Sequence, residues 1–172
     1  MRKAVFGLVL ILAVLALFLM IGCARQVIID KPLVVKPTVR VTAPNDALSV
    51  GENFSLDVSV SDVKELYGFQ FDVAYDPAVL EFQKAAEGTF LNNNGETKSF
   101  CVEYAATPGL IRHIACIKMG GESMNGSGTL EKVSFKAVAS GKSSVTLQNL
   151  KLAKSTAEPI EADVANAEVL VK

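Results

Sequence analysis

The stretch GFQFDVAYDPAVLEF, from Gly68 to Phe82, is the part of the sequence that best predicts the fold. Its first half alternates in polarity, and successive side chains of a β-strand point to opposite sides. One parity is apolar and is expected to be core: Phe69, Phe71, Val73 and Tyr75. The other parity is small and polar: Gly68, Gln70, Asp72 and Ala74. This second row predicts either plain solvent exposure or a surface for a partner.

Short runs rich in Val, Phe, Ile and Thr continue on both sides of this stretch, separated by turn signals such as PND, VGEN, NNNG, TPG and SGKS. Such spacing is typical of an all-β sandwich. We expect about nine strands, at residues 39–43, 53–61, 66–75, 79–84, 98–106, 110–118, 129–139, 143–153 and 163–171. A chain of 172 residues, half of them apolar, can bury one sizeable core, so we expect one domain over residues 39–172.

The N-terminal residues have the pattern of a secretory signal. Arg2 and Lys3 precede an apolar run over residues 4–21, and MIGC at 20–23 is similar to a lipobox, whose cysteine becomes lipidated. We expect a signal peptide at 1–22, a lipid on Cys23, and an extended tether at 23–38, placing the domain on the extracellular face of the cell membrane. An uncleaved anchor and ordinary secretion stay open, because an apolar run of about 18 residues is borderline for spanning a bilayer.

The charge of the chain disfavours nucleic acid as a partner. The sequence has 17 Lys and Arg residues, and removing Arg2 and Lys3 leaves 15 basic against 18 acidic residues, a net charge of about −3. The sequence also has no cluster of basic residues, which a protein that binds nucleic acid needs.

The order of these features resembles a cohesin domain, the receptor module that binds dockerins. The resemblance covers about residues 39–172 and rests on VTAPNDALSVGENFSLDVSVSDV (41–63), YGFQFDVAYDPAVLEF (67–82) and GSGTLEKVSFKAVASGKSSVTL (126–147). It implies a jelly-roll β-sandwich that is not an enzyme. It also implies that a dockerin, itself carrying calcium, docks on the outward face of the sheet built from the third, fifth, sixth and eighth strands.

Strict alternation predicts which residues that face carries. They are Gly68, Gln70, Asp72 and Ala74 on the third strand; Cys101, Glu103 and Ala105 on the fifth; Arg112, Ile114, Cys116 and Lys118 on the sixth; and Lys132, Ser134 and Lys136, which we assign to the eighth strand. Ile114 is the branched aliphatic residue of this set, so we expect it to be the central anchor. Many family members carry Asn and Asp on the third strand where Gly68 and Gln70 stand here, which leaves the identity of the dockerin open.

A hairpin that turns at Pro108-Gly109 would pair 107 with 110, 104 with 113 and 101 with 116. Cys101 then faces Cys116, and outside the cell such thiols usually oxidise, so we expect a disulfide. One geometric objection is that a simple two-residue hairpin makes this a hydrogen-bonded pair, whose Cβ atoms lie farther apart than a disulfide prefers. The core side of the hairpin would carry Phe100, Val102, Tyr104, Ala106, Ile111, His113, Ala115 and Ile117.

The sequence offers no catalytic set and no metal or cofactor site. The single histidine, His113, is expected to be a hydrogen-bonded core residue, and NNNG at 92–95 is expected to form a turn and not a calcium loop. We therefore expect a cell-surface receptor that holds a dockerin-bearing exported protein noncovalently. The alternative is a polysaccharide-binding or structural adhesion lipoprotein, for which only Tyr67 is a candidate exposed aromatic, since Tyr75 and Tyr104 are predicted to point inward.

Overall fold

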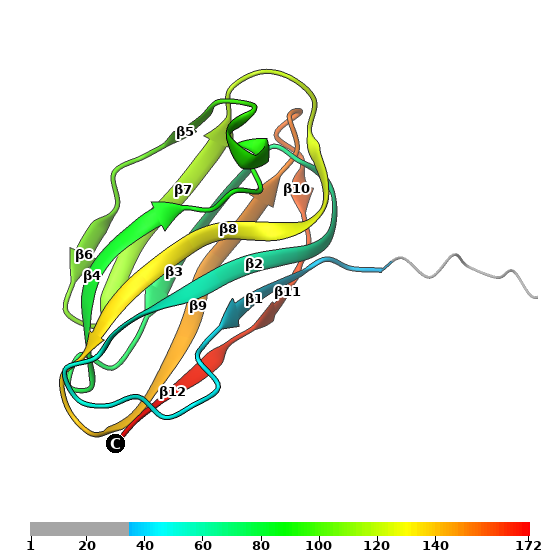
Figure 1. Ribbon diagram of the computed structural model, residues 1–172. Helices are drawn as coiled ribbons and strands as arrows, with labels where there is room; N and C mark the ends of the chain where they lie inside the picture. Colours follow the sequence, from blue (N-terminus) through cyan, green and yellow to red (C-terminus); the bar gives the residue numbers. More distant parts are fainter. Residues whose placement is uncertain (1–34) are drawn as a thin grey trace, which may run out of the picture. The chain divides into compact units, whose positions relative to one another are not determined.

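The computed structural model describes residues 35–172, so the expected signal peptide, Cys23 and most of the expected tether lie outside the described residues. Within 35–172 the chain forms two β-sheets packed face to face, which confirms the all-β sandwich (Figure 1). The fold begins slightly before residue 39, because the carbonyl oxygen of Pro37 already accepts a hydrogen bond from the Asp163 amide at 2.8 Å. No helix in this part of the chain is long and apolar enough to cross a membrane.

The first sheet contains β1 (Thr38–Thr42), β2 (Asn53–Leu66), β4 (Leu80–Glu87), β8 (Met124–Ala137) and β11 (Asp163–Ala165). Its strand order is β11-β1-β2-β8-β4. Neighbouring strands are antiparallel except β1 and β11, which run parallel with Thr38 opposite Asp163.

The second sheet contains β3 (Gly68–Ala74), β5 (Ser99–Cys101), β6 (Ala105–Thr107), β7 (Leu110–Lys118), β9 (Gly141–Ala153), β10 (Pro159–Ile160) and β12 (Ala167–Val171). Its order is β10-β9-β3-β7-β5, with β12 also on β9 and β6 also on β7. The described residues thus hold twelve strands where nine were expected, because 98–106 is split into β5 and β6, 163–171 is split into β11 and β12, and β10 is additional.

The core lies between the sheets and confirms the predicted parity of β3. Phe69, Phe71, Val73 and Tyr75 are each at most 8% exposed, and the Tyr75 ring meets Phe135 of the first sheet edge-on at 5.0 Å. The residues Asn92–Gly95 form a turn, as expected, which ends in the short 3-10 helix η1 (Asn93–Gly95). Asn92 Oδ1 closes this turn by accepting a hydrogen bond from the Gly95 amide at 3.1 Å.

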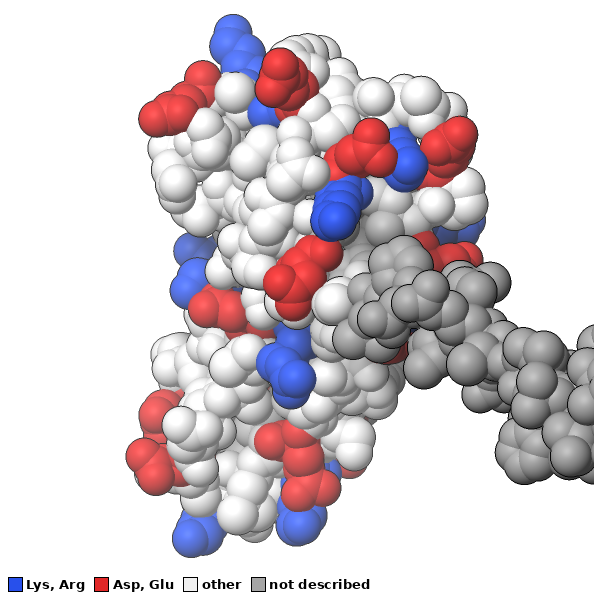
Figure 2. Space-filling view, turned by 90° about the vertical axis from the view of Figure 1, so that its right-hand side faces the viewer, with Lys and Arg blue, Asp and Glu red and all other residues white. Residues whose placement is uncertain are grey.

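The surface carries charges of both signs. On the side of the domain in Figure 2, acidic and basic side chains are interspersed among uncharged ones, and no continuous patch of one sign is visible there. This mixture agrees with the near-neutral composition of the chain.

Candidate functional site

The outer face of the second sheet, the side turned away from the core, is built from rows of residues paired across β9, β3, β7 and β5. One row consists of Ala153, Gly68, Ile117 and Phe100. The next row consists of Lys151, Gln70 and Ala115, and it is continued by Val102, whose amide donates to the Ala115 carbonyl oxygen at 3.0 Å. These two rows bring residues from four strands into one surface.

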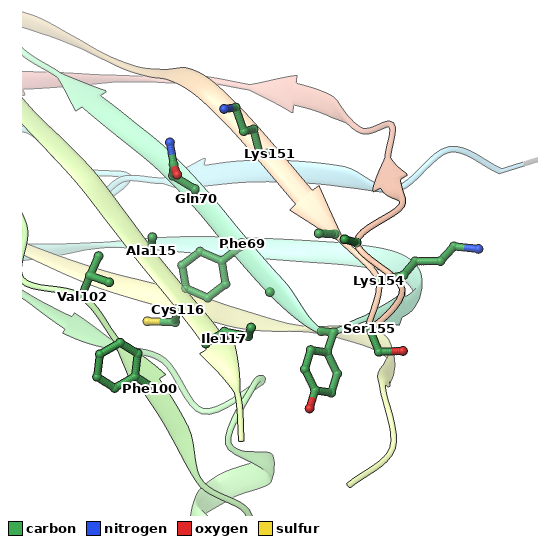
Figure 3. Close-up of a pocket in the computed structure, with 14 residues that line it drawn as sticks. Phe69, Gln70, Phe100, Val102, Ala115, Cys116, Ile117, Lys151, Lys154 and Ser155 are labelled. Atoms are coloured by element: carbon green, nitrogen blue, oxygen red, sulfur yellow. The ribbon is translucent and has the colours of Figure 1, made fainter. Parts of the chain in front are cut away.

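A hollow of about 470 Å³ lies over these rows, and most of the surface that lines it is apolar. Three large apolar side chains stand exposed in it, namely Phe100 at 56%, Ile117 at 46% and Val102 at 44%. We call these three, with the adjoining Tyr67, Ala115 and Ala153, the apolar cluster. Figure 3 shows Phe100 and Val102 on one side of Ile117, and Lys154 and Ser155 on the other. Contiguous exposed apolar side chains are a feature of protein interaction surfaces.

Gly68 keeps this hollow open. A Cβ atom at this position would lie 3.2 Å from the Cys116 carbonyl oxygen and 3.6 Å from Ile117 Cγ1. The absence of a side chain at Gly68 therefore leaves the flank of Ile117 uncovered, and gives β3 a flat surface at the point where the apolar cluster begins.

The rim of the hollow is polar and partly cationic. Lys154 is held by Glu65 at 2.8 Å and by Glu158 at 3.4 Å, and its pKa is raised chiefly by its hydrogen bond to Glu65. Lys151 projects from β9 in the row of Gln70, and none of the salt bridges found within residues 35–172 includes it. An apolar centre with a polar rim is the usual anatomy of a protein interface.

A bulge in β7 overturns the predicted faces of the hairpin. His113 has a positive φ of 61°, and Arg112 and His113 are both exposed, so the alternation shifts by one residue from this point. Ile114, expected as the exposed anchor, is only 3% exposed and belongs to the core. His113, expected in the core, is on the surface.

Several other residues of the hairpin also lie on the side opposite to the predicted one. Cys116 and Lys118, expected on the outer face, are buried at 5% and 3% exposure, and Lys118 Nζ donates to Thr97 Oγ1 at 2.8 Å. Phe100, Val102, Ala106 and Ile117, expected in the core, are exposed or half-exposed. Arg112, Glu103 and Ala105 are exposed as predicted, and Tyr104 packs inward against Phe82 with ring centroids 5.5 Å apart.

Asp72 is on the predicted side of β3 but is only 6% exposed, because its side chain forms hydrogen bonds with the bulge of β7 on one side and the bulge of β9 on the other. Its Oδ1 accepts a hydrogen bond from the His113 amide at 2.8 Å, and its Oδ2 accepts one from Asn149 Nδ2 at 2.7 Å. Asn149, in β9, also has a positive φ, of 52°. Burial alone would raise the pKa of Asp72, but these two hydrogen bonds and the charges of His113 and Arg112 outweigh it and hold the pKa below its ordinary value. The carboxylate of Asp72 therefore stabilises the fold and is not exposed to a partner.

The residues predicted for the eighth strand lie elsewhere. Lys132, Ser134 and Lys136 belong to β8 in the first sheet, where Lys132 pairs with Asp57 at 3.0 Å. The strand that borders β3 on the outer face is β9, which supplies Lys151 and Ala153 to the hollow. The prediction therefore took the wrong one of two strands that are consecutive in the chain but lie in different sheets.

Cys101 and Cys116 form a disulfide, with Cα atoms 4.0 Å apart. The hydrogen bond from the Val102 amide to the Ala115 carbonyl oxygen makes Cys101 and Cys116 a non-hydrogen-bonded pair, the closer of the two antiparallel pairings. The predicted pairing is thus present, and the geometric objection to it does not apply. The bulge at His113 and the break between β5 and β6 each shift their strand by one residue, so the same two cysteines stay opposite each other but become a non-hydrogen-bonded pair.

A pair of carboxyl groups, Glu87 and Glu131, lies across β4 and β8, and Glu87 is near this disulfide. Glu131 is 3% exposed, faces Glu87 across β4 and β8, and has its pKa raised to about 8 by burial and by the charge of Glu87. Glu87, Cys101 and Cys116 also place ligand atoms within 4.8 Å of one another, but the two sulfur atoms are bonded to each other and do not offer thiolates.

The comparisons with known proteins agree with this geometry. A sequence model described as the cohesin domain matches residues 37–171, so the chain belongs to the cohesin domain family, a family of binding modules and not of enzymes. A comparison with curated protein sequences found no match.

Solved structures show the same fold. The chain is similar to a non-cellulosomal cohesin from the hyperthermophilic archaeon Archaeoglobus fulgidus, with a TM-score of 0.64 and 17% identity, covering 80% of this chain and 91% of that one. It is also similar to a chain of a type I cohesin–dockerin complex from Clostridium thermocellum, with a TM-score of 0.63 and 13% identity, covering 80% and 94%. A third example is the sixth cohesin of scaffoldin B from Acetivibrio cellulolyticus in complex with a dockerin, with a TM-score of 0.61 and 16% identity, covering 80% and 99%.

Proposed function

We propose that this domain is a receptor for a dockerin module of another exported protein, and that the partner docks on the outer face of the second sheet. The observation that carries the proposal is the apolar cluster, with Phe100, Ile117 and Val102 exposed side by side on that face. Family membership supports the class of partner, because the similar Clostridium thermocellum and Acetivibrio cellulolyticus structures are cohesin–dockerin complexes.

The shape and charge of the face indicate what the partner presents. A shallow apolar hollow on a sheet fits the apolar stripe of an amphipathic helix. The acids Glu65 and Glu158 at the rim are paired with Lys154, and the exposed charges around it that no salt bridge within residues 35–172 includes are the cations Arg112 and Lys151 and the acid Glu103. We expect carboxylates of the dockerin to flank its apolar stripe, because charges across an interface are arranged to be complementary.

The proposal includes the place of action. Lipidation of Cys23 within MIGC would hold the receptor on the outer surface of the cell membrane, and the bound protein would be retained there noncovalently. The support for this part is the sequence pattern alone. Calcium is expected on the dockerin and not on this domain.

Binding to calcium-loaded dockerin modules from the source organism, measured by calorimetry on the exported protein, tests the proposal. Val102→Ala should weaken binding tenfold or more, whereas Val138→Ala should have no effect, because Val138 is similarly exposed, at 39% against 44%, but follows β8 of the first sheet and does not line the hollow. Equal effects of the two substitutions, or no binding to any dockerin, would refute the proposal.

One observation favours a second candidate, a polysaccharide site in the same hollow. Tyr67 and Phe100 both line it, and aromatic side chains are the usual platforms for sugar rings. A panel of soluble polysaccharides in the same calorimeter separates the two candidates. Binding of a polysaccharide that Phe100→Ala abolishes, without binding of any dockerin, would favour this alternative.

A further inference from the structure

The segment Ser99–Glu103 carries two of the three large exposed side chains of the apolar cluster, Phe100 and Val102, but few contacts of its own hold it in place. None of its side chains is buried, and four of the five residues are exposed. β5 is a three-residue strand at the edge of the sheet and pairs only with β7. An edge strand without buried apolar side chains has low local stability, because only backbone hydrogen bonds favour its ordered state.

The Cys101–Cys116 disulfide supplies the missing constraint. Cys101 lies between Phe100 and Val102, and Cys116 lies between Ala115 and Ile117. Because neighbouring side chains point to opposite faces, the sulfur atoms lie on the core side while the four apolar neighbours stand on the outer face. The covalent bond therefore crosses between β5 and β7 beneath the apolar cluster. Figure 3 shows one end of it, Cys116, between Ala115 and Ile117.

We propose that the Cys101–Cys116 disulfide is a positioning element for the docking surface: it holds Phe100 and Val102 beside Ile117, and the reduced protein stays folded but loses its partner. This inference rests on the proposed function of the outer face. The rest of the cluster does not depend on the disulfide in the same way, since Ile117 and Ala115 belong to β7, which pairs along its length with the central strand β3.

Reduction is chemically accessible in this geometry. A dithiol reductant gives two electrons and two protons to the Cys101–Cys116 bond, leaving two thiols, and is itself oxidised to its disulfide. Cys101 is exposed at the sheet edge, so a thiolate can attack its sulfur without prior unfolding of the domain. Afterwards β5 retains three pairs with β7 and no buried side chain.

A double-mutant cycle on the exported protein tests the proposal. Dockerin affinity is measured for the oxidised and the reduced forms of the wild type, of Phe100→Ala/Val102→Ala, and of Lys151→Ala. We expect reduction to weaken the wild type tenfold or more and the Phe100→Ala/Val102→Ala protein hardly at all, because the side chains through which the disulfide acts are already gone. Lys151→Ala, on β9 and away from β5, should keep the full effect of reduction. Equal effects of reduction in all three proteins would overturn the proposal.

Amide hydrogen exchange gives a second readout that does not need a dockerin. Reduction should increase exchange at the Val102 amide, which donates to Ala115, while the amides of β3 stay protected. Loss of protection throughout β3 would mean that the disulfide supports the whole fold, and unchanged protection at Val102 would mean that it positions nothing. Either result overturns the inference, whereas the absence of dockerin binding in the oxidised wild type refutes the proposed function alone.

Discussion

Asp72 determines the local geometry of the outer face. It binds the His113 amide and the Asn149 side chain at once, and so joins bulges on both neighbours of β3. A carboxylate buried with two hydrogen bonds is costly to lose, because its partners are left unsatisfied.

We therefore expect Asp72→Ala to destabilise the domain by about 1–3 kcal/mol at pH 7, measured by urea unfolding. The pKa of Asp72 is lowered in the folded state, so its contribution is present above the ordinary pKa of 3.8 and is lost as the pH falls through the folded pKa. The difference between wild type and variant should accordingly shrink in strong acid. Glu103→Ala is the control, since Glu103 is exposed. A pH-independent difference would contradict the assigned role.

Glu131 should have the opposite dependence on pH. Its pKa is raised from 4.5 to about 8 by burial and by Glu87, so its neutral form stabilises the fold fully below pH 4.5, and this stability is lost as the pH rises toward 8. Neither Glu131 Oε2 nor Glu87 Oε1 has a hydrogen-bond partner among the described residues.

Glu131→Gln should therefore raise the free energy of unfolding by about 1–3 kcal/mol at pH 9 and change it little at pH 4, as measured by urea unfolding at both values. Glu81→Gln, on the exposed side of β4, serves as the control. A gain of equal size at both pH values would show that the ionisation of Glu131 is not the cause.

At the scale of the strand, the sequence predicted the pairings of the hairpin correctly and its faces incorrectly. Thr107 pairs with Leu110 and Cys101 with Cys116, as the turn at Pro108-Gly109 predicts. The faces differ because alternation by two assumes an uninterrupted ladder, whereas a bulge inserts one residue. The signal was present in the spacing of Ile111, Ile114 and Cys116, where a step of three precedes a step of two.

This correction predicts a sharp contrast between two residues of one strand. Ile114→Ala should destabilise the domain by about 2–5 kcal/mol, because it empties a core site, whereas Ile117→Ala should cost less than about 1 kcal/mol. Thermal and urea unfolding of the two single variants give the comparison. If Ile117→Ala proved the more destabilising of the two, the bulge at His113 would be misplaced.

At the scale of the whole molecule, periodicity and turn residues were enough for the fold. The alternating stretch at Gly68–Phe82 and the regular turn spacing predicted two layers and one core, as observed. The candidate site was predicted less well. Gly68 and Gln70 border the hollow as expected, but Phe100, Val102 and Ile117 were assigned to the core, because strict alternation does not allow for the bulge at His113 or for the break between β5 and β6.

We expect the proposed attachment to the membrane to depend on Cys23. A lipid chain contributes about 0.8 kcal/mol of membrane affinity per buried CH₂. Cys23→Ser should therefore release the protein to the medium or leave an uncleaved precursor, as seen by fractionation and mass measurement. Retention and processing equal to the wild type would contradict lipidation at this residue.

The parallel pairing of β1 with β11 has a consequence for how the domain comes to be folded. β1 leaves the ribosome before every other strand of the domain, yet its partner β11 follows β2–β10 in the chain, and the bridge between Leu48 and Val171 closes later still. β12 then adds Val169 and Val171 to the core. Neither sheet can be completed while the chain is still being synthesised, and non-local pairings of this kind form slowly. We therefore expect the domain to reach its native fold only after the residues of β12 have been synthesised.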